Sequence, residues 1–301
     1  MYEVAKTDQT ACYDARGKEV DCAGTGQDAA HNAGKDWPGP RFGTRGDTVL
    51  DGLTGLVWTL EAGLGGFPLT HDEALQEVAR MAGDRAHGYD DWRLPSRREL
   101  FSLVSHVNVN PALPDGAPFQ EVFPGYYWTA TPVARLPREA WYVHLGGARV
   151  FKGMRYGSYM VWPVRGEGLP ETTEGPRWEP VAGDSARDLL TDLVWRDMGC
   201  GPVDWAEALD RVAQWNRDNP DSGAWRLPNI RELESVCDTS THSPAIGKGH
   251  PFTHVMPGCW SSTTSVYEAS YAWVLYPEDG ALGVGHKPGR EFCVWAVRDG
   301  Q

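Results

Sequence analysis

The chain contains one ordered set of motifs twice, at an offset of 132 to 137 residues. A nearly constant offset through several separate motifs predicts a duplicated domain, because the unit of a solenoid is only about 20–50 residues long. We call the two halves copy one and copy two. Four motifs carry the match: DGLTGLVW at 51–58 with DLLTDLVW at 188–195, WRLP at 92–95 with WRLP at 225–228, WTAT at 128–131 with WSST at 260–263, and VWPVR at 161–165 with VWAVR at 294–298.

The duplication divides the chain of 301 residues into an arm, a linker and two domains, and each domain is long enough to bury a core of its own. The arm is rich in Gly, Asp and Ala, and we expect it to form a short hairpin and to lie across one domain. The linker is rich in Gly, Glu, Thr and Pro. The predicted segments are the N-terminal arm at 1–46, the first domain at 47–166, the linker at 167–183 and the second domain at 184–301.

Both copies predict the same order of elements, namely a short strand, two helices and then a run of short strands. Each helix start has a capping residue followed three positions later by Glu: these pairs are Thr70 with Glu73, Ser96 with Glu99, Asp204 with Glu207, and Asn229 with Glu232. Short apolar and aromatic runs predict strands at 56–58, 126–131, 140–145, 148–152 and 158–165, and again at 193–195, 259–264, 271–276, 281–285 and 291–298. Helices followed by a run of strands are typical of the α+β class.

The repeated motifs, together with the arm sequence CYDARGKEVDC and the later WPGPRF, resemble the Lcl C-terminal domain family over nearly the whole chain. The resemblance implies two tandem C-type-lectin-like domains, akin to the formylglycine-generating enzyme domain. In that fold two helices pack on small twisted antiparallel sheets, and a loop-rich face presents ligand-binding residues.

The known chemistries of that fold do not carry over to this chain. Calcium-dependent lectins use Glu-Pro-Asn or Gln-Pro-Asp followed by Trp-Asn-Asp, and the chain has none of these in the expected region. Formylglycine-generating enzymes use a reactive cysteine pair late in the domain, whereas copy one has no cysteine. The histidines show no metal-binding spacing. We therefore expect no catalytic residues, no metal site and no cofactor, and leave open a structural calcium ion.

The six cysteines predict disulfides, because their number is even and no close CxxC pair indicates a metal site. Cys12 and Cys22 flank a turn in the arm and form the safest pair. Copy two holds the other four, which allow three connectivities, and a Cys259–Cys293 pair is a guess. The remaining two cysteines are Cys200 and Cys237.

Disulfides predict a secreted or periplasmic location. The start of the chain, at 1–6, is polar and lacks the apolar stretch of a leader, so we expect a mature chain whose leader has been removed. The net charge of −13 opposes binding to nucleic acid. No apolar run is long enough to span a membrane, so membrane insertion is not expected.

Residues that match between the copies are interpreted as parts of the fold. Arg93 and Arg226 each follow the Trp of the WRLP motif, and an anion site at the helix start is one interpretation. We favour a buried arginine that binds Glu99 or Glu232 through paired hydrogen bonds. The tryptophans that recur at matched positions are likewise interpreted as core residues rather than sugar-stacking residues.

Residues that differ between the copies are the candidates for ligand binding, because exposed Tyr, Trp and Arg are enriched in recognition surfaces. An ordinary solvated sheet face is the alternative interpretation of the same residues. The candidates in copy one are Arg135, Arg138, Trp141, Arg149 and Tyr156. Those in copy two are Tyr267, Tyr271, Tyr276, His286 and Arg290.

Three functions are compatible with these observations. We favour a non-catalytic ligand-binding protein that recognises a glycan or a protein surface, and expect the basic residues of copy one to suit an anionic sugar. The second is an oxidase related to formylglycine-generating enzymes, which needs a redox-active thiol. The third is a structural or assembly module of the cell envelope. An oligomer is left open.

Overall fold

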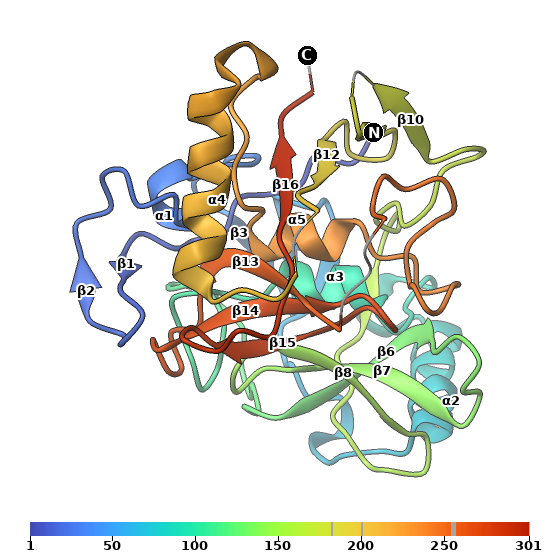
Figure 1. Cartoon of the computed structure of the whole chain (residues 1–301). Helices are drawn as coiled ribbons and strands as arrows, with labels where there is room; N and C mark the ends of the chain where they lie inside the picture. Colours follow the sequence, from blue (N-terminus) through green and yellow to red (C-terminus); the bar gives the residue numbers. More distant parts are fainter. Residues whose placement is uncertain (182, 200, 254–256, 301) are drawn as a thin grey trace. The chain divides into compact units, whose positions relative to one another are not determined.

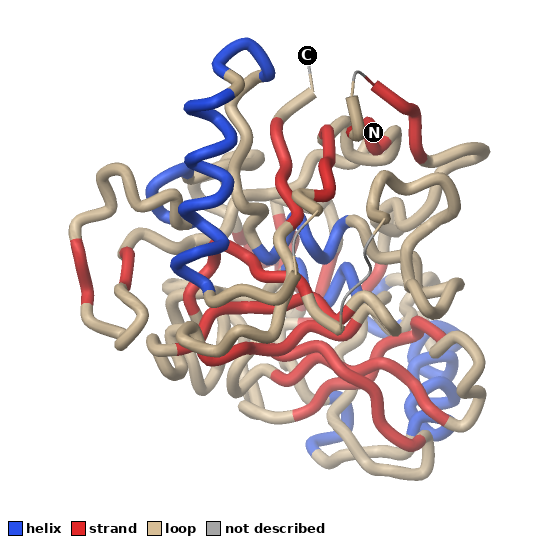
Figure 2. Tube along the Cα trace, in the orientation of Figure 1, coloured by secondary structure: helices blue, strands red, loops and turns tan. Residues whose placement is uncertain are grey.

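The computed structural model describes residues 1–181, 183–199, 201–253 and 257–300. By its contacts the chain divides into two units, which we name after the copy that each contains. The copy-one unit is 37–169, and the copy-two unit combines 1–36 with 170–301. Short helices and small antiparallel sheets make up both units (Figure 2), so the predicted α+β class is confirmed.

The copy-one unit contains two antiparallel sheets. One has the order β3-β4-β5-β9, and in the other β7 lies between β6 and β8. The longer helix, α2, packs its apolar stripe on the second sheet. The elements are β3 Phe42–Arg45, β4 Thr48–Asp51, β5 Val57–Thr59, η1 Leu64–Gly66, α2 His71–Gly83, η2 Ala86–Gly88, α3 Arg97–Ser102, β6 Tyr126–Pro132, β7 Glu139–His144, β8 Arg149–Met154 and β9 Val164–Arg165.

The copy-two unit repeats this plan and adds the arm (Figure 1). One sheet has the order β10-β11-β12-β16, β14 lies between β13 and β15, and β1 pairs with β2 in the arm. The elements are β1 Cys12–Tyr13, β2 Glu19–Val20, α1 Asp28–His31, β10 Trp178–Val181, β11 Ser185–Asp188, β12 Val194–Asp197, α4 Trp205–Asp218, η3 Pro220–Ser222, α5 Ile230–Ser235, β13 Cys259–Thr264, β14 Tyr271–Tyr276, β15 Ala281–His286 and β16 Trp295–Arg298.

The predicted helix starts are confirmed in both copies. Thr70, Ser96 and Asn229 each accept the backbone N–H three residues later, and the Glu at that position accepts the capping residue's own N–H. The Asp204 side chain accepts the Glu207 backbone N–H and so caps α4. The Glu207 side chain pairs with Arg211 and Arg290 and does not complete the capping box. The predicted last strands are shorter than expected, and only their final residues form β9 and β16.

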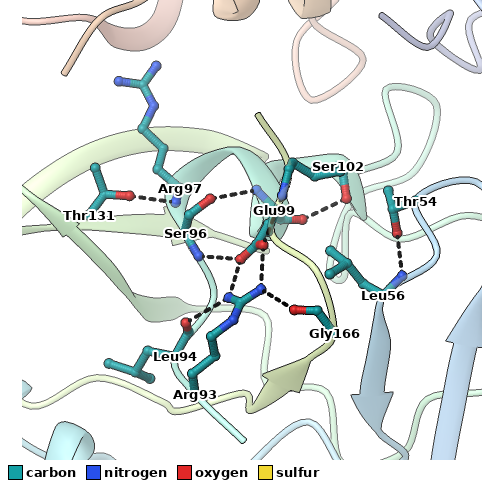
Figure 3. Close-up of polar contacts among 11 residues, drawn as sticks. Thr54, Leu56, Arg93, Leu94, Ser96, Arg97, Glu99, Ser102, Thr131 and Gly166 are labelled. Atoms are coloured by element: carbon teal, nitrogen blue, oxygen red, sulfur yellow. Dashed lines mark hydrogen bonds and ion pairs between the residues drawn. The ribbon is translucent and has the colours of Figure 1, made fainter. Parts of the chain in front are cut away.

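An arginine at the matched position of each copy, half-buried as Arg93 and buried as Arg226, holds the start of the second helix, as we favoured over an anion site. Arg93 donates from both terminal nitrogens to Glu99, at 2.6 and 2.7 Å, and Glu99 also accepts the Ser96 N–H (Figure 3). Arg226 donates to Glu232 at 2.6 Å in copy two. The shared pair supports a structural role, because it ties the helix cap to the sheet.

A second matched ion pair was not predicted. Arg41 donates to both carboxylate oxygens of Asp51 at 2.8 Å and to the Ser102 carbonyl, while Arg177 makes the same pair with Asp188 at 2.8 and 2.7 Å. All four side chains are buried. Each pair fastens the end of an α-helix to the strand that opens its copy.

The tryptophans that recur at matched positions lie in the cores, which confirms their interpretation as fold residues. Six are completely buried: Trp58, Trp128, Trp162, Trp195, Trp260 and Trp295. Trp128 and Trp260 occupy the same place in the two copies, and each donates its indole N–H to the backbone just before the first long helix.

The disulfide prediction is confirmed for Cys12–Cys22 and wrong for Cys293. The arm disulfide closes the β1–β2 hairpin. Cys293 is a buried free thiol, so the guessed Cys259–Cys293 bond is not formed although the two backbones are bridge partners. The Cys237 thiol lies within hydrogen-bond reach of two carbonyls, and Cys200 lies outside the described residues. Buried thiols pack as small apolar side chains.

Candidate functional site

The structure separates the basic residues that we predicted as one cluster in copy one. Arg135 and Arg138 are exposed in the loop between β6 and β7, whereas Arg149 is exposed at the start of β8. The β7–β8 register pairs Arg149 with His144 at one end of the hairpin and Glu139 with Met154 at the other. Five residues of strand correspond to roughly 17 Å. The prediction of a single basic site is therefore wrong.

Two predicted contact residues are parts of the hydrophobic packing. Trp141 is only 1% exposed, and the Cζ atom of Arg97 lies over the Trp141 ring, 4.6 Å from the ring centroid. Tyr276 is half-buried against the core of copy two, and its ring lies 6.0 Å from that of Phe292. Trp141 is therefore a core residue, and its interpretation as an exposed contact is wrong. Alternate strand residues point to opposite faces, and the sequence alone did not fix which face is buried.

The other predicted residues of copy two are exposed or half-buried but do not gather into one site. Tyr267 is 67% exposed, and the half-buried Tyr271 ring lies 5.1 Å from the exposed His286 ring. Arg290 is neutralised by Glu207, at 2.6 Å, and by Asp204. In copy one, Tyr156 is 76% exposed and follows β8.

A cluster of aromatic side chains lies on one face of β6, β7 and β8. The cross-strand register places Trp128, Tyr142 and Phe151 in one row and Tyr126, His144 and Arg149 in the adjacent row. Both rows point to the same face because their members are two residues apart along each strand. Tyr159 follows from the segment after β8 and packs on Trp128, with ring centroids 4.2 Å apart. We name Tyr126, Tyr142, Phe151 and Tyr159 the aromatic platform.

The rings of the platform are in mutual contact, and Tyr126 and Phe151 are exposed whereas Tyr142 and Tyr159 are half-buried against the core of copy one. Tyr126 lies 5.0 Å from both Tyr142 and Tyr159, which are themselves 5.2 Å apart. Tyr126 is 43% exposed and Phe151 is 45% exposed. In the described part of the chain no hydrogen bond reaches the three tyrosine hydroxyls. The platform therefore offers apolar ring surface together with uncommitted polar groups.

Polar side chains line one edge of the platform. The His144 ring lies 4.7 Å from that of Tyr126, and both His144 and the exposed Asn110 lie beside Gly146, in the turn before Arg149. Burial and the positive charge of Arg149 lower the pKa of His144. Burial, followed by the neighbouring phenols, raises the pKa of Tyr142 to about 12. At neutral pH the edge thus presents a neutral imidazole, neutral phenols and one guanidinium.

Copy two has lost this platform at the matched positions. Its row is Trp260, Val274 and Gly283, where copy one has Trp128, Tyr142 and Phe151. The glycine is required, because a Cβ at Gly283 would lie 2.9 Å from the Tyr276 ring. A Cβ at Gly258, just before β13, would likewise collide with Phe292 at 2.4 Å. Copy two therefore packs aromatic side chains over the face that copy one leaves open.

The sequence did not predict the platform, although part of it lies among the residues that differ between the copies. An alternation of aromatic or polar residues, at 126 and 128, at 142 and 144, and at 149 and 151, marks the exposed face of neighbouring strands. The register needed to align these three alternations was not available from one chain. The described residues contain no group of three or more His, Cys, Asp or Glu side chains arranged to hold a metal ion.

The comparison with known families identifies both copies. The model of the Lcl C-terminal domain matches residues 47–165 and 184–298. The chain belongs to the Lcl C-terminal domain family. A search of curated proteins finds no match. Within the described ranges, no helix has both the length and the apolar character needed to cross a membrane.

Proposed function

We propose that this protein is a non-catalytic, extracytoplasmic ligand-binding protein, and that copy one binds a carbohydrate on its aromatic platform. The observation that carries the proposal is the half-exposed set of touching rings in copy one, which copy two replaces by Val274 and Gly283. A face kept open in one copy and filled in the other is more than a requirement of the fold.

The chemistry of the platform suits a sugar better than a wholly apolar ligand. The flat apolar face of a pyranose ring can stack on Tyr126 and Phe151, which supply apolar area at small cost in conformational entropy. Its hydroxyls then lie beside the phenols of Tyr142 and Tyr159. His144 and Arg149 add hydrogen-bonding groups at the edge. A few polar groups around an apolar surface are typical of small-ligand sites.

Family membership and the arm disulfide support the remaining parts of the proposal. A C-type-lectin-like fold for each copy agrees with the family and with the observed order of short strand, two helices and three-stranded antiparallel sheet. Secretion or export to the periplasm agrees with the Cys12–Cys22 disulfide, because such bonds persist in oxidising compartments.

A glycan array followed by calorimetry on the best-binding glycan tests the proposal. We expect Tyr126→Ala combined with Phe151→Ala to weaken binding about tenfold or more, because removal of central aromatic contacts usually costs more than about 1 kcal/mol each. The matched control is Tyr267→Ala, which removes an exposed tyrosine from copy two and should leave the affinity unchanged. The absence of any bound glycan, or equal affinity in the platform variant, overturns the proposal.

A further inference from the structure

The arm occupies a defined surface of copy two, formed by the end of β13, the start of β14 and the residue after β15. The Gln9 side chain accepts the Thr264 N–H at 2.9 Å and donates to the Thr264 carbonyl at 2.6 Å, as a neighbouring strand would. Asp28 accepts the Thr263 hydroxyl at 2.6 Å. Gly17 lies so close to Ser270 that a Cβ would approach its backbone nitrogen to 2.8 Å. This surface therefore holds a polypeptide segment through a side-chain amide, a helix residue and a turn.

A buried lysine anchors the arm on that surface, and burial lowers its pKa to about 7. Lys287 is completely buried, and its Nζ donates to the carbonyls of Tyr13 and Asp14, each at 3.2 Å. The same ammonium lies 4.1 Å from the centroid of the Trp205 ring, a favourable cation–π contact. The Asp14 carboxylate is close enough to interact with the Lys287 charge. Copy two thus binds backbone carbonyl groups of the arm through Lys287 at the end of its sheet.

The backbone identifies the same surface in copy one. The backbone N–H of Lys287 donates to the Ser270 carbonyl, and the backbone N–H of Trp205 donates to the Lys287 carbonyl. In copy one the backbone N–H of Arg155 donates to the Arg138 carbonyl, and the backbone N–H of His71 donates to the Arg155 carbonyl. Arg155 and Arg138 therefore match Lys287 and Ser270.

Residues 1–36 of the arm belong to the copy-two unit, and the matched surface of copy one carries exposed arginines. Arg135, Arg138 and the 76% exposed Tyr156 line it, and Arg155 is half-exposed beside the exposed Asp72. No ion pair to Arg135 or Arg138 is found in the described parts of the chain. An exposed pair such as Arg155–Asp72 contributes little energy and leaves room for a competing carboxylate. We name Arg135, Arg138, Arg155 and Tyr156 the basic surface.

We propose that the basic surface of copy one docks an acidic peptide segment of a partner protein. Copy two shows that this place on the domain accepts a polypeptide, and the charge of the copy-one residues selects an acidic one. The arm of a second molecule is a poorer occupant, because Pro132 stands where Thr264 receives Gln9 and has no N–H to donate. The surface lies at the opposite end of β8 from Arg149, so the proposal is independent of carbohydrate binding.

Fluorescence anisotropy with a labelled peptide of alternating Glu and Ser tests the proposal on the full chain. We expect binding at low salt, at least fivefold tighter than for the same peptide with Gln in place of Glu. Arg135→Ala combined with Arg138→Ala should weaken it about tenfold. The matched control is Arg45→Ala combined with Arg80→Ala, which removes the same charge from exposed sites elsewhere in the unit and should retain wild-type affinity.

Three results would overturn the proposal: equal affinity in the Arg135/Arg138 variant, an equal loss in the control, or tighter binding of a heparin fragment than of the Glu-Ser peptide. The last result would assign the basic surface to an anionic polysaccharide. Circular dichroism of each variant confirms that the fold is retained. Unchanged glycan binding in the Arg135/Arg138 variant separates this test from that of the aromatic platform.

Discussion

The two copies share one sheet register but use its faces differently. Trp128 and Trp260 begin the same cross-strand row, which continues with Tyr142 and Phe151 in copy one. In copy two the row continues with Val274 and Gly283, and aromatic side chains fold over it. The end of the same sheet shows the same difference, since the arm covers it in copy two and copy one leaves it uncovered. The two copies therefore share a scaffold, and copy one leaves open the two surfaces that copy two covers.

The difference teaches which residues belong to the scaffold. Ion pairs, helix caps and buried tryptophans recur with nearly the same geometry in both copies, so selection for one ligand does not explain them. The platform and the basic surface occur in copy one alone. Substitution of a shared residue should therefore have an equal effect in the two copies. Substitution of a residue found in one copy should have an effect in that copy only.

The largest expected effect concerns the matched buried ion pairs. Asp51→Ala and Asp188→Ala each leave a buried arginine without its carboxylate, which costs about 3–5 kcal/mol. Urea unfolding should record similar losses for the two variants. Asp47→Ala, at an exposed site, is the control and should change stability by less than about 0.5 kcal/mol. A large loss in only one copy would contradict a shared scaffold.

A matched pair of threonines should give unequal effects, because only one of them meets the arm. Thr263 accepts the Ile230 N–H and donates to Asp28, whereas Thr131 accepts the Arg97 N–H. We expect Thr263→Val to cost about 1–3 kcal/mol and to speed limited proteolysis of the arm. Thr131→Val should leave arm proteolysis unchanged. Equal proteolysis in both variants would show that Asp28 does not hold the arm.

Asp28 of the arm should also make the unfolding free energy depend on pH. Burial raises the pKa of Asp28 to about 6, against the opposing hydrogen bonds that the hydroxyls of Thr263 and Thr7 donate to it. A carboxyl with a raised pKa binds its proton more tightly in the folded state, so its contribution is present near pH 4 and is lost as the pH rises through about 6. Asp28→Asn should reduce the fall in unfolding free energy between pH 4 and 6. If the unfolding free energy of the variant falls as steeply between pH 4 and 6 as that of the wild type, Asp28 is not the cause of this pH dependence.

The smallest expected effect is at a single platform hydroxyl. Tyr142→Phe removes an oxygen that accepts no hydrogen bond from the described residues, so stability should change by less than about 0.5 kcal/mol. Loss of a neutral hydrogen bond to a sugar should weaken glycan binding by about 0.5–1.5 kcal/mol, measured by calorimetry. A stability loss without an affinity loss would make Tyr142 a packing residue only.

Much of the fold could be predicted because residues close together in the sequence determine its helix starts and strands. Thr70 with Glu73 and Ser96 with Glu99 specify helix starts by spacing alone, and the structure confirms both caps. The Arg93–Glu99 pair was predictable because it recurs as Arg226–Glu232 beside a capping residue. The Arg41–Asp51 pair was missed because it involves a segment outside the recognised motifs.

The candidate site was harder to predict because it depends on register and on strand face. Trp141 and Tyr142 are neighbours in sequence, yet one is buried and the other belongs to the platform. Arg138 and Arg149 seemed to form one basic group, but a strand length separates them. The covering of copy two by the arm is a tertiary contact between segments more than 250 residues apart, such as Gln9 and Thr264, which no local pattern encodes.

The central claim is that copy one carries the carbohydrate site and copy two does not. Backbone NMR shifts during titration with the best glycan from the array test it most directly. The account predicts shifts around Tyr126, Tyr142 and Phe151, and none around Val274 and Gly283. Shifts of equal size at both sets of matched positions, or at those of copy two alone, would contradict it.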